Sequence, residues 1–171
     1  MRSIVIALGF LLSINAFAAN TPPGFNKAAW DALVSKISAE GTVQNIEAGE
    51  LHYLSVINPS DTSLSHHASY ISTLVNYDSA NKPIITDVSA VDEDWQTDGQ
   101  GNWTINQWTY HTTVAGDLLS IDHTILKEHE GQVLADDEVD TGDITSDENM
   151  GRWGQLLGAW MYLATAQAQA K

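Results

Sequence analysis

The sequence predicts an α+β fold in which a helix, a long antiparallel meander and a second helix follow one another. Apolar residues recur at helical spacing over 27–40 and again from Met150 to Ala164. Between these segments, 41–139 consists of short runs rich in Val, Ile, Thr, Tyr and Trp, separated by Gly, Pro, Asn and Asp. The connections are too short for parallel crossovers, so neighbouring strands must be antiparallel.

The first helix is expected at 27–40, after an extended Thr-Pro-Pro-Gly leader and a start at Asn26. Phe25 and Trp30 stand at the two positions of a hydrophobic staple. Gly41 is expected to end the helix in a left-handed conformation. The apolar face that we expect to be buried contains Trp30, Leu33, Val34 and Ile37.

The meander is expected to contain about six to seven strands. Their predicted ranges are 43–48, 50–57, 70–77, 83–91, 102–115, 117–127 and 132–139. Tight turns are expected at 78–81, 98–101, 115–117 and 130–131, with 58–69 as the one long excursion.

The second helix begins after several acidic residues and is expected to pack on the sheet. Gly151, Gly154 and Gly158 lie on another part of its surface, where small residues would allow a close neighbour. The apolar stretch is short and Arg152 interrupts it, so packing is favoured over membrane insertion. Its buried stripe is predicted to be Met150, Trp153, Leu157, Trp160, Met161 and Ala164.

Helix, curved antiparallel sheet and helix, in this order, resemble the cystatin-like or nuclear-transport-factor-like cones, or a sheet curled into a small barrel. The resemblance is one of element order alone, and no residue motif in the chain points to a named family. It therefore implies a fold and no site residues.

Residues 1–18 have the three parts of a secretory signal. Arg2 supplies the positive charge, 4–14 form a short apolar core, and Ala16-Phe17-Ala18 form a cleavage site. We expect one domain over 19–171, exported to the periplasm or the exterior. The chain has no Cys, so it offers neither a lipoprotein anchor site nor disulfides.

The charge balance restricts the partners. Beyond the signal, 6 basic side chains face 22 acidic ones. Such a field repels nucleic acid and anionic membrane surfaces, which bind proteins through Lys and Arg. Cations, basic proteins and small molecules are the expected partners, although surplus carboxylates also simply keep an exported protein soluble.

Two groups of acidic and histidine residues could each bind a divalent cation, or could simply be exposed to solvent. The segment 137–148 can be laid on a calcium-binding EF-hand loop, but Val139 falls where an oxygen ligand is required. A looser calcium site would use Asp140, Asp143, Asp147 and Glu148. If every strand pairs with its sequence neighbour, one loop end becomes a rim suited to zinc, copper or nickel. Its members would be His66, His67, Asp92, Glu93, Asp94, Asp98, His129 and Glu130.

The other candidate site residues lie on the predicted strands. Leu119, Ile121, His123 and Ile125 share one face that resembles core, so the imidazole needs a partner there. A polar strip containing His111 lies on the preceding strand. Trp103, Trp108 and Tyr110 could form a stacking platform, but Trp103 and Trp108 must point to opposite faces.

These patterns favour a non-enzymatic module that binds a small ligand or a basic protein on the concave face of the sheet. The alternative is a cofactor-free hydrolase, isomerase or cyclase with a pocket at His123. Asp122 cannot serve His123 from the adjacent position of one strand, so an acid such as Asp87 would be required. No catalytic residue is assigned and no cofactor is expected, apart from the calcium or zinc weighed above.

Overall fold

The computed structural model describes residues 20–57 and 64–169, with side chains described for 20–55 and 64–163. The predicted signal segment 1–18 lies outside these residues, so export stays a prediction. The described chain is α+β, with two helices and one sheet. Its elements are α1 (Lys27–Glu40), β1 (Thr42–Ile46), β2 (Gly49–Ile57), β3 (Ser65–Tyr77), β4 (Pro83–Thr97), β5 (Asn102–Thr112), β6 (Leu118–His129), β7 (Gln132–Val139) and α2 (Asp147–Gln169).

The predicted meander is confirmed. The seven strands lie in chain order across the sheet, and each is antiparallel to its sequence neighbour. The sheet is open, with β1 and β7 at its edges, so it does not form the closed barrel that was one of the expected variants.

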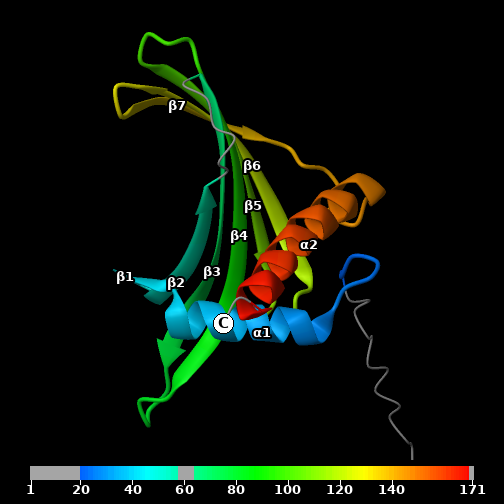
Figure 1. The fold of residues 1–171 in the computed structure, drawn as a ribbon. Helices are drawn as coiled ribbons and strands as arrows, with labels where there is room; N and C mark the ends of the chain where they lie inside the picture. The colour runs from blue at the N-terminus through cyan, green and yellow to red at the C-terminus, as the bar shows by residue number, and fades with distance from the viewer. Residues whose placement is uncertain (1–19, 58–63, 170–171) are drawn as a thin grey trace, which may run out of the picture.

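Both helices pack against the same face of this sheet, which we call the inner face (Figure 1). The covered part of the inner face supplies the core together with the buried faces of α1 and α2. The core contains Trp30, Leu33, Val34, Ile37, Ile71, Val88, Ala90, Tyr110, Leu118, Ile121, Trp153, Leu157 and Trp160.

α1 begins and packs as predicted, but its end differs. The Asn26 side chain accepts a hydrogen bond from the Ala29 amide, and the rings of Phe25 and Trp30 lie 6.1 Å apart. Gly41 is extended, with φ −67°, and the left-handed stop is therefore wrong. A Cβ at Gly41 would lie 2.4 Å from the carbonyl oxygen of Ile37, so glycine is needed there for close approach.

A bulge corrects the predicted core face of β6. His111 pairs with Ser120 and Thr112 pairs with Leu118, which leaves Leu119 outside the regular register. Leu118 is consequently fully buried, whereas Leu119 is 56% exposed. The prediction of Leu119 as a core residue is wrong because strict alternation breaks at a bulge.

The strands β3 and β4 are longer than predicted. β3 starts at Ser65 instead of 70, and β4 continues to Thr97 instead of ending at 91. The segments that sequence patterns placed in loops are therefore paired strands. They belong to the end of the sheet that extends past α2, which we call the projecting end (Figure 1). Its polar composition hides the strand pattern, because no covering helix demands an apolar face there.

α2 confirms the predicted stripe within the described side chains: Trp153, Leu157 and Trp160 are buried, and Met150 and Met161 pack against the core. Gly154 meets the Pro22 ring, with 3.2 Å between a Cβ built there and the Pro22 Cβ, while Gly151 and Gly158 face open space. No described helix is long and apolar enough to span a membrane.

Candidate functional site

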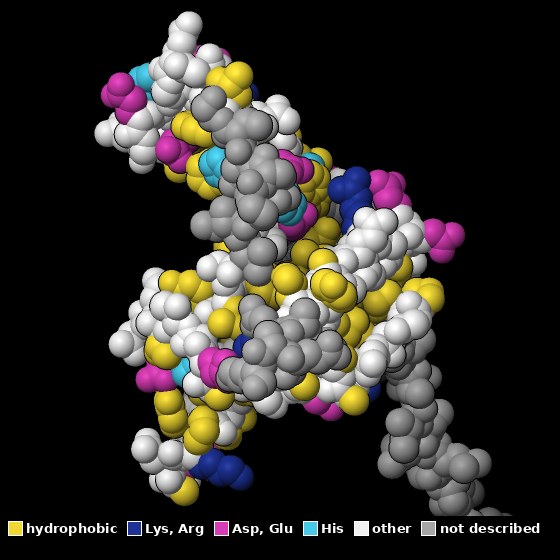
Figure 2. Space-filling view, viewed as in Figure 1, with side chains coloured by type: hydrophobic (Ala, Val, Ile, Leu, Met, Phe, Trp, Pro, Cys, Tyr) yellow, Lys and Arg dark blue, Asp and Glu magenta, His cyan; other side chains and the backbone are white. Residues whose placement is uncertain are grey.

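A hollow of about 510 Å³ lies between α2 and the inner face of β3, β4 and β5. We call it the central groove. Histidine, acidic and basic side chains gather where the projecting end meets α2 (Figure 2). The sheet contributes His67, Asp92, Asp94, Trp108 and Tyr110 to this groove, and α2 contributes Arg152, Gln155, Leu156 and Ala159.

His67 joins two carboxylates in the groove. Its Nε2 lies 2.9 Å from Asp92 Oδ1 and its Nδ1 lies 2.8 Å from Asp94 Oδ1. Burial alone would lower the pKa of His67, but the hydrogen bond to Asp94 and the two negative charges raise it above its usual value. Burial also raises the pKa of Asp92. Because both ring nitrogens face carboxylates, the site favours the protonated imidazole, which can donate to each of them.

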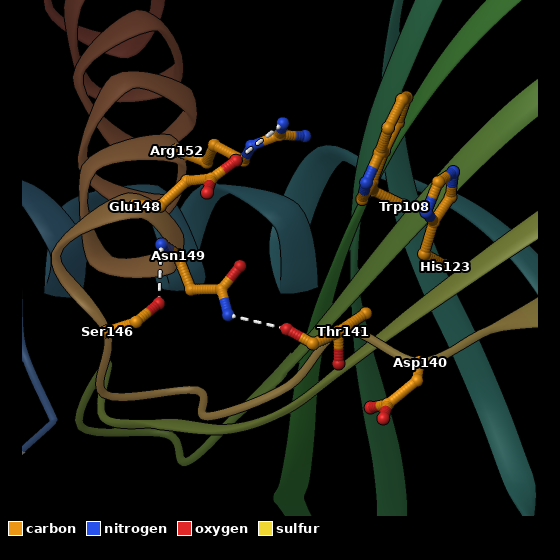
Figure 3. Close-up of a pocket in the computed structure, with 8 residues that line it drawn as sticks. All are labelled: Trp108, His123, Asp140, Thr141, Ser146, Glu148, Asn149 and Arg152. Carbon is orange, nitrogen blue, oxygen red and sulfur yellow. Dashed lines mark hydrogen bonds and ion pairs between the residues drawn. The ribbon is translucent and has the colours of Figure 1, made fainter.

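Trp108 forms the middle of a three-layer stack. Its ring is stacked on the His123 imidazole, with ring centroids 4.2 Å apart and an angle of 14° between the planes. The Arg152 guanidinium carbon lies 5.4 Å from the centre of the indole. Figure 3 shows the indole between the guanidinium, which reaches over from α2, and the imidazole. A cation over an indole face is attracted by its negative π-surface.

The Tyr110 hydroxyl group lies at the groove and has no hydrogen-bond partner among the described residues. The residue is 3% exposed and its ring stacks on Trp153, at 5.5 Å between centroids. Among the described residues, no hydrogen bond reaches its hydroxyl group. Burial first, and then the charge of Asp92, raise the pKa of Tyr110 to about 12, while Arg152 acts in the opposite direction. The hydroxyl is not among the buried unpartnered atoms of the described residues, so it reaches solvent at the groove and is available to a ligand.

A second, smaller hollow of about 260 Å³ lies at the start of α2. It shares Trp108 and Arg152 with the central groove, and His123 also borders it (Figure 3). His123 Nε2 is buried and has no hydrogen-bond partner among the described residues. Burial and the nearby Arg152 charge lower the pKa of His123, so the ring is neutral at neutral pH. The partner that sequence analysis required for this histidine is not supplied by the described residues.

The predicted ligand-binding residues divide between the two faces of the sheet. Trp108, Tyr110 and His123 lie on the inner face, in or beside the central groove. His111 and Trp103 lie on the opposite face. There His111 Nε2 lies 2.9 Å from Asp122 Oδ2, which agrees with the expectation that Asp122 turns away from His123.

The residues of the predicted metal rim are also separated. His66 is on the outer face and stacks on Trp95 at 4.9 Å, whereas His67 is on the inner face. His129 Nδ1 contacts the side-chain oxygen of Asn102 at 2.8 Å. The described residues contain no group of three or more His, Asp and Glu side chains arranged to hold a metal ion.

The predicted calcium segment forms turns and a helix start. Asp140 Oδ1 accepts a hydrogen bond from the Gly142 amide, and Asp143 Oδ1 accepts from the Thr145 amide and hydroxyl. Those hydrogen bonds lower the pKa of Asp143. Asp147 and Glu148 occupy the first turn of α2, where carboxylates are favoured by the helix dipole. Local backbone structure therefore accounts for these four acids without a metal.

Arg152 is the groove residue that sequence analysis missed as a ligand contact. The sequence does contain a feature that points to Arg152, because the chain has only one other arginine, Arg2. In an acidic protein, a single arginine next to the buried Trp153 is unusual, and this makes its guanidinium group a candidate ligand contact. No family model, curated protein or solved structure matches this chain.

Proposed function

We propose that the protein is an exported, non-enzymatic binding protein that takes a small polar molecule in the central groove. The observation that carries the proposal is the groove itself, whose wall includes the Tyr110 hydroxyl group, a solvent-reached group with no hydrogen-bond partner among the described residues. A ligand that hydrogen-bonds this hydroxyl would replace the water that otherwise solvates it. The groove volume of about 510 Å³ lies within the usual range for small-molecule sites.

The aromatic and charged lining supports a small molecule over a basic protein. Trp108 and Leu156 offer apolar surface, and the polar groups that could orient a ligand are few and grouped. This mixture is typical of ligand pockets. The acidic net charge of −15 would attract a basic protein to many parts of the surface without favouring this groove.

The enzyme alternative has less support. A general base needs a ring nitrogen that can take a proton from a substrate. Both nitrogens of His67 already face carboxylates, and no described side chain orients the second nitrogen of His123. Neither histidine therefore combines a carboxylate on one ring nitrogen with a second nitrogen left for a substrate.

Binding can be tested by NMR with the mature chain and a library of small polar compounds. We expect some compounds to shift the Trp108 indole and Tyr110 signals, and Tyr110→Phe to weaken their binding about tenfold through loss of one hydrogen bond. Trp103→Ala is the matched control, because Trp103 lies on the outer face. A library without a single groove binder, or binders that Tyr110→Phe leaves unchanged, would contradict the proposal.

A further inference from the structure

The central groove holds charges of both signs on either side of one aromatic ring. Building on the proposed function, we infer that its ligand is a small zwitterion of the amino-acid class. The ammonium group lies toward Asp92 and Asp94, and the carboxylate lies toward Arg152.

The negative end of the groove has acceptor capacity left. An ionised carboxylate offers two oxygens and about four lone-pair sites. His67 contacts one oxygen each of Asp92 and Asp94, the Oδ1 atom in both cases. The Oδ2 atoms accept no hydrogen bond from another described side chain. An ammonium group with three donors fits between two such acceptors.

The positive end has donor capacity left. A guanidinium carries five N–H donors in a planar fork that matches a carboxylate. Among the described residues, the hydrogen bonding of Arg152 is limited to one contact of 3.1 Å with Glu148 Oε1. Stacking on Trp108 holds the guanidinium over the groove and leaves its edge available.

The two ends of the groove meet at the same aromatic ring, Trp108. Asp92 is the direct cross-strand partner of Trp108, and Arg152 lies over the same indole. The Tyr110 hydroxyl is within electrostatic reach of both Asp92 and Arg152. A hydroxyl between opposite charges can donate to one ligand group and accept from another.

The charge balance of the groove favours a zwitterion over a simple ion. With His67 protonated, two positive side chains face two negative ones, although the whole chain carries −15. A simple cation would leave unused the N–H donors that Arg152 has beyond its contact with Glu148, and a simple anion would meet Asp92 and Asp94. Leu156 and Ala159 on α2 supply a contact surface for an apolar ligand side chain.

The test uses calorimetric titration of the mature chain at pH 6.0 with three probes: L-phenylalanine, L-phenylalaninamide and N-acetyl-L-phenylalanine. The amide lacks the carboxylate and the acetylated form lacks the ammonium group. We expect each capped form to bind at least about tenfold more weakly than the free amino acid, because each loses a charge-assisted contact. L-leucine and its two capped forms repeat the comparison with a smaller side chain.

Three variants test which end of the groove binds each charged group of the ligand. Arg152→Gln should remove the preference for L-phenylalanine over its amide, and Asp92→Asn should remove the preference over the acetylated form. Asp122→Asn, on the outer face, is the matched control and should preserve both preferences. If the capped forms bind as well as the free amino acids, or if neither amino acid binds, the zwitterion inference is overturned. Groove binding by other compounds in the NMR experiment would still support the proposed function.

Discussion

The covered part of the sheet and its projecting end are built from the same strands but differ in burial and in the residue types that they contain. On β5, Tyr110 is buried beneath the helices, whereas Trp103 at the other end of the strand is only partly buried. On β4, Ala90 is in the core and Asp94 is in solvent. Burial selects apolar residues in the covered part, and the projecting end is free to carry histidines and carboxylates. The candidate groove lies at the boundary, where buried aromatic rings meet solvated charges.

The largest effect should come from the covered part. Trp160→Ala should lower the free energy of unfolding by about 3–5 kcal/mol, because Trp160 is 4% exposed within the core stripe of α2. Trp95→Ala, at the projecting end, should cost only about 1–2 kcal/mol, since the ring is only partly buried. Urea denaturation of both variants measures the difference. Equal losses would mean that the two parts of the sheet share one core.

Substitution of two glycines can distinguish the cost of backbone strain from the cost of a steric clash. Gly116 has φ +97°, and a Cβ there would lie 2.5 Å from the Phe25 ring. Gly131 has φ +84° but faces open space in the β6–β7 turn. Gly131→Ala should cost about 1 kcal/mol from strain alone, and Gly116→Ala about 2–3 kcal/mol from strain and the clash with Phe25. Thermal unfolding of the two variants checks this order, and a Gly131→Ala loss as large as that of Gly116→Ala would contradict it.

The smallest effect depends on pH. The raised pKa of His67 means that the protonated ring stabilises the fold below its unfolded pKa, and that this contribution is lost as the pH rises through the folded pKa. His67→Gln should therefore destabilise the protein more at pH 6 than at pH 8. The difference should stay below about 1 kcal/mol, because the side chain is 38% exposed and solvent screens the pair.

Urea titrations at both pH values measure that difference. The shift of His123 has the opposite sign, but this residue is present in both proteins and cancels. In an Asp92→Asn, Asp94→Asn background, His67→Gln should lose its pH dependence. Persistence of the pH dependence there would place its origin outside the clamp that His67 forms with Asp92 and Asp94.

Much of the fold was predictable because burial imposes a period. The buried faces of α1 and α2 follow helical spacing, and the meander follows from connections too short for crossovers. The ends of β3 and β4 were missed because residues such as His67 and Asp94 carry no such period. Leu119 was misplaced because a bulge shifts the register without a local sequence signal.

The site was predicted only in part, because strand alternation can be inferred from the sequence whereas tertiary contacts cannot. Trp108, Tyr110 and His123 follow from strand alternation, which is a local rule. Arg152 reaches the groove only because α2 crosses the sheet at that place, and this contact depends on tertiary packing. The clamp of His67 likewise depends on β3 and β4 being paired beyond the predicted loop.

The two edges of the open sheet differ in their resistance to aggregation. β7 carries Asp136, Asp137 and Glu138 just before its last residue, Val139, and charges on an edge discourage pairing with another copy. β1 has no charged residue, and all five of its residues are exposed. We therefore expect the net charge of the whole chain, and not β1 itself, to keep the β1 edges of different copies apart. That repulsion disappears near the isoelectric point of about 4.4, where β1 becomes the expected place for copies to associate.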